Sequence, residues 1–573
     1  MKMKRLLACG LAAVAACSSV AALGACSEVI EDIDATKTQL YVANYNGGVG
    51  EKWLDEAAKR FEEEYKDVVF EPGTDKVGAQ IMIRHNKSYD GLSLKNSIGT
   101  DTLYEVYFTG GANYLDFTGN GYLYDLTNLV TNKVNKDDGK TILSKMDENF
   151  ADALTLEGKI YAIPHYELFN MPSYDAGVFQ SKKLYFADEI DTADTEYPGT
   201  RKFIVNNMTK KSCGPNGKYG DYDDGLPSSV HEFYKMMDKM TKNNVKPFVW
   251  TGASQHYTNQ LLRAIYFNLG GVGLLNGLYE FDSKGVPVEI VTDFNADGTP
   301  KIQEVVITKE NGYLVKQAAA LYYGIEMAQK IRSSQANFHV PCVSSTFSHL
   351  TAQEAFASSG LDGEGYIGML IDGNWWYNEA NDAGIFERIA RAYPEDYQKK
   401  DFKVMPMPVQ YAGTVTEGNG KAPVVMTPSD ALAFVNKNIQ DNKIMIMEEF
   451  LSFVYSDDEL CKFTEITNGI RRSFNYDYSS VKPTLNSFAK SSLELLETAQ
   501  AAGTYRVGVT SNQIYTYNTA VFNVGANSWT DTMKGMFPIA AFDTSSTKAD
   551  ARNWFKNLWI TSDSWAAMKQ SGN

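Results

Sequence analysis

The chain has 573 residues, a formal charge of −16 at pH 7 and 44% hydrophobic residues, which is enough for two or more domains with their own cores. An acidic chain without clustered Lys and Arg is a poor partner for nucleic acid or anionic lipid, because binding a phosphate backbone needs such clusters. Aromatic residues make up 12% of the chain, led by 34 Tyr; their flat faces and polar edges suit sugar rings, although large cores also use them.

Residues 1–25 have the pattern of a signal peptide. Lys2, Lys4 and Arg5 precede an apolar stretch too short to span a membrane permanently. The stretch ends in Leu23-Gly24-Ala25-Cys26, which resembles a bacterial lipobox. We therefore predict cleavage before Cys26, lipidation of its thiol and an extracytoplasmic protein anchored to the cell membrane. Cleavage removes three basic side chains and no acid, which changes the charge from −16 to −19 over 548 residues.

Two alternatives stay open for this segment. Val14-Ala15-Ala16-Cys17 is a second cleavage box, although it leaves only about eleven apolar residues before it. The other is an ordinary secretory signal in which Cys26 is incidental. Residues 26–37 are polar and acidic and are predicted to form a tether. No later run of eighteen apolar residues occurs, so the N-terminal anchor is the only membrane contact that the sequence predicts.

Only three cysteines follow Cys26, and they lie far apart at positions 213, 342 and 461. An odd number of widely separated cysteines argues against a disulfide framework. We expect three isolated thiols that are buried as small apolar side chains, with a single bridge as the alternative.

The first elements predict a βαβ unit. Gln39–Ala43 is a β-prone run, followed by a glycine turn at residues 44–50 and a helix. In that helix Trp53, Leu54, Ala57, Phe61 and Tyr65 share one stripe at helical spacing, and Val68–Glu71 is predicted as the next strand. This alternation favours an α/β fold with a doubly wound parallel sheet.

Similar alternation continues along the chain. We predict strands at 103–108, 159–163, 247–250 and 367–371, and helices at 258–269, 314–331, 442–454 and around Phe233, Met236, Met237 and Met240. Residues 196–225 and 276–313 are richer in Gly, Pro, Asp and Lys and are predicted to be insertions.

Four segments, in collinear order behind the lipobox, resemble the sugar-type extracellular solute-binding proteins of ATP-binding-cassette importers, which are similar to the maltodextrin-binding protein. They are residues 45–65, 157–164 with 174–179, Ile367–Trp376, and 442–454 leading into Ser456-Asp457-Asp458-Glu459. The resemblance implies a two-lobed periplasmic-binding-protein-like fold, with a doubly wound sheet and flanking helices in each lobe. Lobe one would comprise 38–164 and 409–455, and lobe two 165–408 and 456–573, with hinges at Pro164, at 405–408 and after Val454.

The same resemblance implies a carbohydrate ligand, with an oligosaccharide expected, that is captured between the lobes and delivered to membrane permease subunits. It implies a monomer that is not an enzyme and requires no cofactor. Two rival functions stay open: a lipid-anchored glycan-degrading enzyme and a surface glycan-binding adhesin. The sequence contains no His-Glu-x-x-His or Gly-x-Ser-x-Gly motif that would favour an enzyme.

Candidate ligand-binding residues follow predicted strands, at the sheet edge where open α/β sheets bind ligands. Asn46 lies in the glycine turn after the first strand, where a plain tight turn is the alternative. The turn Asp372-Gly373-Asn374-Trp375-Trp376 offers Asp372 and Asn374 as polar groups. Two adjacent indoles cannot both face one core, so either Trp375 or Trp376 is expected to stack on the ligand, with core packing as the rival.

Three further candidates come from the resemblance. Glu167 follows the first crossing between lobes and would accept hydroxyl hydrogen bonds; a solvated loop acid is the alternative. Trp250 ends a predicted strand and is otherwise a core residue. Tyr515 lies where related proteins offer an aromatic side chain to the cleft, although Tyr517 shares its face if the segment is extended.

Two acidic loops suggest structural calcium. Asp293–Gly298 with Glu304 has the ligand spacing of an EF-hand loop, but its flanks resemble strands, so we expect a β-hairpin. The second loop offers Asn216, Asp221, Asp223 and Asp224 before a helix. Some larger relatives hold calcium near this point, and a solvated or helix-capping turn is the alternative.

Overall fold

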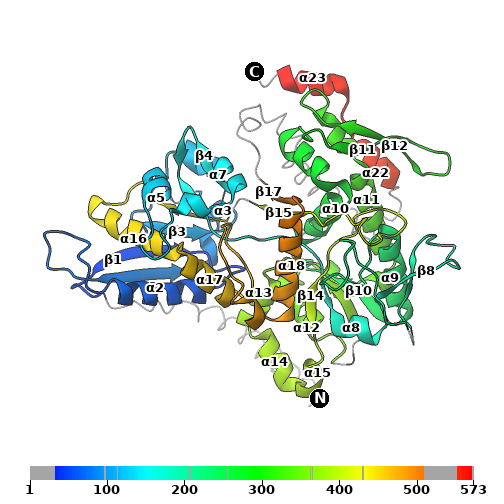
Figure 1. The fold of residues 1–573 in the computed structure, drawn as a ribbon, viewed down its shortest axis with the longest axis horizontal. Helices are drawn as coiled ribbons and strands as arrows, with labels where there is room; N and C mark the ends of the chain where they lie inside the picture. The colour runs from blue at the N-terminus through cyan, green and yellow to red at the C-terminus, as the bar shows by residue number, and fades with distance from the viewer. Residues whose placement is uncertain are drawn as a thin grey trace, which may run out of the picture.

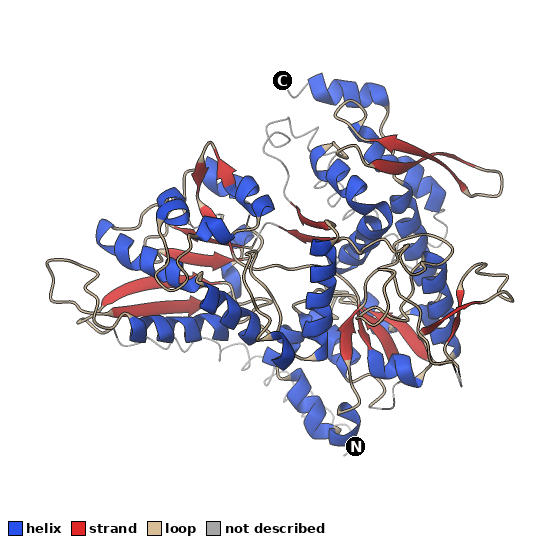
Figure 2. Ribbon diagram, in the orientation of Figure 1, coloured by secondary structure: helices blue, strands red, loops and turns tan. Residues whose placement is uncertain are grey.

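The computed structural model describes residues 33–508 and 551–570, apart from 96–97, 113, 206–207, 255, 362, 364 and 429–430. The predicted signal peptide, Cys26 and Tyr515 lie outside the described residues. Two bodies of strands and helices lie side by side (Figures 1 and 2), and segments from both halves of the chain contribute to each.

The first body is built on a five-stranded sheet with the order β2-β1-β3-β16-β6. Its strands are β1 (Thr38–Asn44), β2 (Ala79–His85), β3 (Val106–Thr109), β16 (Leu432–Val435) and β6 (Ala162–Pro164). β1 pairs in parallel with β2 and β3, whereas β16 is antiparallel to both of its neighbours. Helices α2 (Lys52–Glu64), α16 (Ile444–Val454) and α17 (Asp457–Ile466) pack on it, and the smaller helices are α3 (Gly91–Leu94), α4 (Tyr114–Gly119), α5 (Thr127–Asn132), α6 (Ile142–Lys145) and α7 (Glu148–Leu154).

The predicted βαβ unit is present, but the prediction that its second strand spans Val68–Glu71 is wrong. That segment is a loop whose Phe70 side chain is buried against Phe61, with ring centroids 6.2 Å apart. The apolar run is therefore a loop that packs beside α2. The next strand, which pairs with β1, begins eight residues later, at Ala79. The helix itself matches the prediction, because Trp53, Leu54, Ala57 and Phe61 are all buried.

The second body contains a four-stranded sheet with the order β10-β13-β7-β14. Its strands are β10 (Val245–Val249), β13 (Tyr366–Leu370), β7 (Ser173–Asp175) and β14 (Phe402–Val404). β10 and β13 run parallel, so their carboxyl ends open on the same edge. The helices that pack on this sheet are α8 (Ala176–Ser181), α9 (Val230–Lys242), α12 (His349–Ala357) and α18 (Ser487–Ala501).

Within the described residues, this body also contains α10 (His256–Glu280), α11 (Ala319–Arg332), α13 (Trp376–Asp382), α14 (Ile385–Ala392), α15 (Pro394–Tyr397), α22 (Ala551–Asn557) and α23 (Ser562–Gln570). The span Leu261–Glu280 of α10 is long and apolar enough to cross a membrane, but 72% of it is buried inside the protein. We interpret it as a core helix.

Two small sheets involve the predicted insertions. Strands β8 (Phe186–Ile190) and β9 (Arg201–Phe203) form one antiparallel pair, and β11 (Pro287–Phe294) and β12 (Pro300–Val306) form the other. The insertion 276–313 contains both strands of the second pair, and 196–225 contributes β9 to the first, whose strand β8 precedes the insertion. The β11–β12 pair confirms the hairpin reading of Asp293–Gly298 over the EF-hand reading. At its tip Asp297 accepts hydrogen bonds from the Thr299 backbone and hydroxyl, at 3.0 and 2.7 Å, as in an ordinary polar turn.

The lobe edges deviate from the expected residue numbers. α17, expected in lobe two, packs on α2 of the first body through the Arg60–Glu459 ion pair at 2.6 Å and a Trp53–Phe463 ring contact at 5.3 Å. Residues 409–415, expected in lobe one, lie with lobe two, where the Val409 nitrogen donates to the Ser228 carbonyl at 3.2 Å. Between the bodies, β15 (Val425–Pro428) pairs in parallel with β17 (Tyr505–Gly508).

Candidate functional site

The glycine turn after β1 is fixed by a buried asparagine. The Asn44 side chain is fully buried, and its amide lies 3.4 Å from the Gly50 carbonyl and 3.0 Å from His85 Nδ1. Gly48 and Gly50 have φ of +75° and +73°, a backbone conformation that residues with a side chain rarely adopt. The predicted ligand residue Asn46 is half-buried in this turn and donates to Glu51 Oε1 at 2.6 Å.

The facing turn, after β13, has two predicted polar residues that hold the framework. Asn374 is 8% exposed, accepts from the Phe169 nitrogen at 3.1 Å and donates to the Glu167 carbonyl at 3.2 Å. Both of its side-chain polar atoms therefore fasten this turn to the segment that crosses between lobes. Asp372 is 2% exposed and accepts from the Gly373 nitrogen at 2.8 Å.

A second acid lies near Asp372. The Gln353 amide nitrogen is 3.1 Å from Asp372 Oδ2 and also 3.1 Å from Glu379 Oε2. Burial, and then the charge of Glu379, raise the pKa of Asp372 well above its usual value. The buried carboxyl therefore favours its protonated form, as a hydrogen-bonded group beneath the turn.

The two tryptophans of this turn have different environments. Trp376 is fully buried among aromatic rings. Its ring centroid lies 5.4–5.9 Å from those of Phe356, Tyr377, Phe386, Phe402 and Phe488. Trp375 is half-buried, and its indole lies so close over Gly373 that a Cβ there would be 1.9 Å from Trp375 Cζ3. Trp376 is thus a core residue, and Trp375 is the indole that remains available to a ligand.

The two turns meet. A Cβ on Gly48 would lie 3.4 Å from the Trp375 Cβ, and one on Gly50 would lie 2.7 Å from Asp382 Oδ2. The turn after β1 therefore lies beside both ends of α13, at Trp375 and at Asp382, across the junction of the two bodies. This contact defines the candidate inter-lobe site.

Glu167 and Trp250 lie deeper than expected. Glu167 is 2% exposed and its Oε1 accepts from the Tyr505 hydroxyl at 3.2 Å, while its Oε2 has no protein partner among the described residues. Burial raises the pKa of Glu167, which the charge of Arg471 partly counters. Trp250 is 3% exposed and packs on Phe338 at 5.3 Å. Both environments resemble those of framework residues.

A polar cavity of about 900 Å³ lies beside the inter-lobe contact. Both bodies line it, through the turn after β1 and the start of α2 on one side, and α12 and α13 on the other. It includes Asn46 but none of the other predicted ligand residues that the structure describes. Its lining is rich in amide and charged groups, among them Glu51, Lys52, Asn378 and Asp382.

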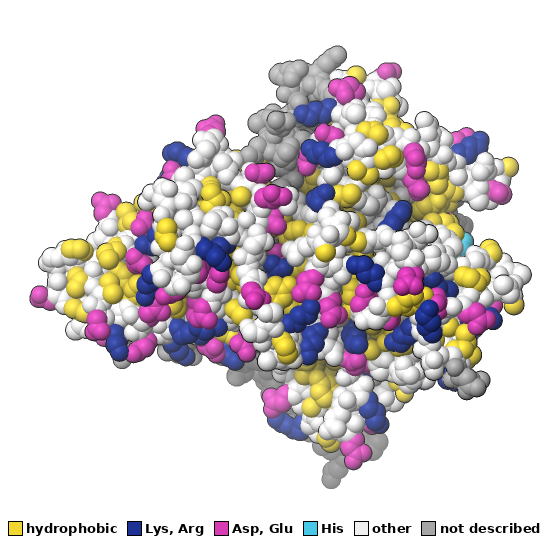
Figure 3. Space-filling view, viewed as in Figure 1, with side chains coloured by type: hydrophobic (Ala, Val, Ile, Leu, Met, Phe, Trp, Pro, Cys, Tyr) yellow, Lys and Arg dark blue, Asp and Glu magenta, His cyan; other side chains and the backbone are white. Residues whose placement is uncertain are grey.

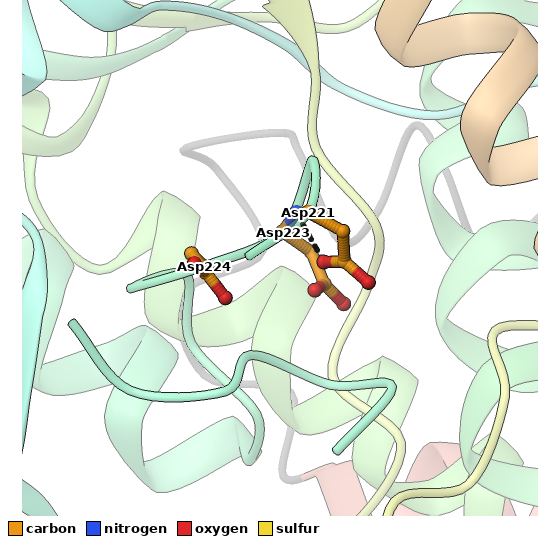
Figure 4. A group of neighbouring side chains, drawn as sticks. All are labelled: Asp221, Asp223 and Asp224. Carbon is orange, nitrogen blue, oxygen red and sulfur yellow. Dashed lines mark hydrogen bonds between the residues drawn. The ribbon is translucent and has the colours of Figure 1, made fainter. Parts of the chain in front are cut away.

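The second acidic loop brings three carboxylates together. Oxygen atoms of Asp221, Asp223 and Asp224 lie within 4.8 Å of one another (Figure 4). Asp223 is fully buried with Oδ1 unpartnered among the described residues, and burial, followed by interaction with Asp221, raises its pKa well above the usual value. The side-chain amide of Asn216 donates a hydrogen bond to Asp221 Oδ2 at 2.8 Å, so in this arrangement Asn216 stabilises the loop. The three aspartates fit a hard cation, which prefers oxygen ligands.

Three tyrosines near the site were not predicted: Tyr45, Tyr166 and Tyr257. A Cβ on Gly110 would lie 2.5 Å from the Tyr166 hydroxyl and 3.2 Å from the Tyr45 ring. Tyr257 lies 6.5 Å from Trp375, centroid to centroid. Position in the sequence offered a signal only for Tyr45, which directly follows β1.

The cysteines match the expectation in part. Cys213, Cys342 and Cys461 are free thiols, of which the first two are fully buried and the third is half-buried. Figure 3 shows acidic and basic side chains interspersed over the visible face, without a basic patch of the kind that binds nucleic acid.

No protein-family model and no curated protein sequence matches the chain. Three solved structures are similar to it in fold. A "Chitin oligosaccharide binding protein" has 13% identity and a TM-score of 0.53 over 93% of this chain and 99% of its own. RafE in complex with raffinose has 12% identity and a TM-score of 0.53, over 91% of this chain and 100% of its own. The apo form of RafE from Streptococcus pneumoniae has 12% identity and a TM-score of 0.51, over 92% of this chain and 100% of its own. The likeness confirms the predicted two-lobed, periplasmic-binding-protein-like α/β fold.

Proposed function

We propose that this chain is a carbohydrate-binding protein that captures its ligand between the two lobes. One observation carries the proposal: the half-buried Trp375 indole packs against Gly373 at the point where the turn after β1 meets α13. Such a half-buried indole offers an apolar face to the C–H groups of a sugar ring, and polar groups nearby can bind its hydroxyls. The sugar-binding neighbours of the same fold support this reading.

The finer role that we propose is the substrate-binding component of an ATP-driven importer. A ligand that contacts both lobes favours the closed arrangement in proportion to its differential affinity for that state. Membrane permease subunits would then recognise the loaded, closed monomer. The polar cavity of about 900 Å³ has room for several sugar units and supports an oligosaccharide as the ligand.

We further propose that the chain is extracytoplasmic and lipid-anchored through Cys26 after removal of residues 1–25. This rests on the lipobox-like sequence alone. Mass spectrometry of the N-terminal peptide from membranes tests it: a diacylglyceryl group on Cys26 supports the anchor, and a Cys26→Ala variant released into the medium is the matching control.

We also propose a structural calcium ion at Asp221, Asp223 and Asp224. A divalent cation would offset both the mutual repulsion of these carboxylates and the cost of removing them from water. The melting temperature is expected to rise with calcium and fall with chelator, and Asp223→Asn should abolish this response. The acidic tip residue Asp297 lies in the hairpin, so Asp297→Asn is the control that should keep it. A wild-type melting temperature indifferent to calcium would refute the site.

The central test is a thermal-shift and calorimetric screen of the purified protein against raffinose, chitooligosaccharides and maltooligosaccharides. A bound ligand stabilises the protein by about 2.7 kcal/mol at one hundred times its dissociation constant. The same samples should be analysed for shortened products. Binding without cleavage supports the proposal, whereas cleavage would favour the rival enzyme, and no binding to any sugar would overturn it.

A further inference from the structure

We infer that the core of the first body binds a small monovalent anion of the halide type, through the Arg472 guanidinium together with Trp53, His165 and Tyr455. All four side chains are at most 2% exposed, so the anion would be a structural constituent of the protein and not a transported ligand. The inference goes beyond the proposed function and does not depend on whether the chain binds a sugar.

Four elements bring these side chains together. Trp53 lies in α2 and His165 directly follows β6, while Tyr455 directly follows α16 and Arg472 lies in the segment after α17. The Trp53 and His165 rings are 4.9 Å apart, centroid to centroid. The guanidinium carbon of Arg472 lies 4.7 Å from the centroid of the Trp53 ring and 4.6 Å from that of Tyr455. The guanidinium is therefore the centre of one buried cluster.

The positive charge of Arg472 has little compensation within this cluster. A guanidinium stays protonated at neutral pH, and this one is fully buried, with Nη1 donating to the Val454 carbonyl at 3.1 Å. The charge of Glu459 acts on Arg472, but both carboxylate oxygens of Glu459 already accept from Arg60, at 2.7 and 2.6 Å. Since a buried charge without a counterion is costly, a negative charge at this position would stabilise the fold.

The cluster also offers more hydrogen-bond donors than acceptors. Arg472 Nε and Nη2, Trp53 Nε1 and the Tyr455 hydroxyl are buried and have no hydrogen-bond partner among the described residues. The same holds for both ring nitrogens of His165. Burial, followed by the charge of Arg472, lowers the pKa of His165 well below its usual value, so this imidazole is neutral and offers one N–H.

This donor set suits an anion better than water. A water molecule accepts two hydrogen bonds and must donate two of its own, whereas an anion accepts from every donor and supplies the missing charge. Phe463 also borders the guanidinium, with its ring centroid 4.5 Å from the guanidinium carbon. Three aromatic rings thus surround the charge, and such apolar surroundings favour a small monovalent ion over a doubly charged oxyanion, which costs more to remove from water.

The test measures the melting temperature of the full-length protein after dialysis into sodium methanesulfonate, whose anion is bulkier than a halide. Sodium chloride or bromide then replaces this salt at constant ionic strength. Because a ligand that binds the folded state stabilises it by mass action, we expect the melting temperature to rise by about 2–4 °C at saturating halide.

Two arginine variants locate the effect. Arg472→Gln removes the charge and should abolish the response to halide. Arg201→Gln is the matched control, because Arg201 is also buried but has a carboxylate beside it, with Nη1 3.5 Å from Glu232 Oε1; its response should persist. Should Arg472→Gln not fold, as judged by circular dichroism, Tyr455→Phe removes one donor at nearly unchanged volume and should weaken the apparent halide affinity about tenfold.

Crystals grown in sodium bromide give the second readout. An anomalous bromide peak within hydrogen-bond distance of Arg472 Nη2, together with the halide response, supports the inference. A melting temperature indifferent to halide would overturn it and leave ring stacking alone to stabilise the guanidinium; a bromide peak without that response would be an adventitious ion only. A response that persists in folded Arg472→Gln would place the ion elsewhere and overturn the inference as well. Sugar binding is measured separately, so none of these results decides the proposed function.

Discussion

The two turns that meet at the candidate site are built in different ways. In the turn after β1, the buried backbone of Gly48 lies beside Trp375, and the side chains of Tyr45 and Asn46 are half-buried. In the turn after β13, most side chains are buried, and only Trp375 remains half-exposed. A polar, aromatic motif in a sequence can thus be mostly framework, with one residue left for the ligand.

The largest expected effect separates the two adjacent tryptophans. Trp376→Ala should lower the free energy of unfolding by about 3–5 kcal/mol, because it empties a fully buried aromatic site. Trp375→Ala should change stability far less and should weaken sugar binding. Urea unfolding and calorimetry measure the two effects. Equal losses of stability in both variants would contradict the division of roles.

A smaller effect is expected where the Trp375 indole covers glycine. The new methyl group of Gly373→Ala would meet the indole at 1.9 Å, so the ring must move, at a cost of about 1–3 kcal/mol in stability. Sugar affinity should fall as well. Gly111→Ala has open space but a φ of +70°, so it controls for backbone strain and should leave the affinity intact. Unchanged binding by Gly373→Ala would show that the indole position is unimportant.

The buried acid beneath the turn predicts a pH dependence. Because folding raises the pKa of Asp372, the folded state binds its proton more tightly than the unfolded state. The free energy of unfolding should therefore fall as the pH rises from 3.8 through the raised pKa, by about 1.4 kcal/mol per pH unit. Asp372→Asn should remove this contribution.

Chemical unfolding at a series of pH values measures this pH dependence of the free energy of unfolding. Asp152→Asn, at an exposed aspartate, is the control and should keep the wild-type slope. Identical slopes for Asp372→Asn and the wild type would show that the carboxyl is ionised throughout, in spite of its burial.

The smallest effect is expected in the turn after β1. Asn46→Ala removes a hydrogen bond to the exposed Glu51, so stability should stay within about 0.5 kcal/mol. Loss of a hydroxyl contact should weaken sugar binding by about 1 kcal/mol. Asn132→Ala, which removes a comparable exposed hydrogen bond in α5, should leave binding unchanged. Calorimetry that finds the two variants equal would remove Asn46 from the site.

Several elements were predictable because their determinants are local. The apolar stripe of α2, the strand before the glycine turn and the hairpin at Asp293–Gly298 follow from side-chain periodicity and turn chemistry. The false strand at Val68–Glu71 shows the limit. A short apolar run fits a strand or a packed loop equally well, and the choice depends on whether β1 has another partner.

Periodicity along the chain determined the α/β class and the turns at which strands end, because these depend on near neighbours in sequence, whereas the two lobes were implied by the resemblance to a known family. Only the tertiary structure decided which residues of those turns are free. The Asn374 side chain is hydrogen-bonded to the backbone of Phe169 and Glu167, some 200 positions away. Trp376 is packed among rings from four other elements, and the Tyr45 ring lies beside Gly110. Burial and hydrogen-bond occupancy are set by such distant contacts, so the sequence could name the turns of this site but could not assign their side chains.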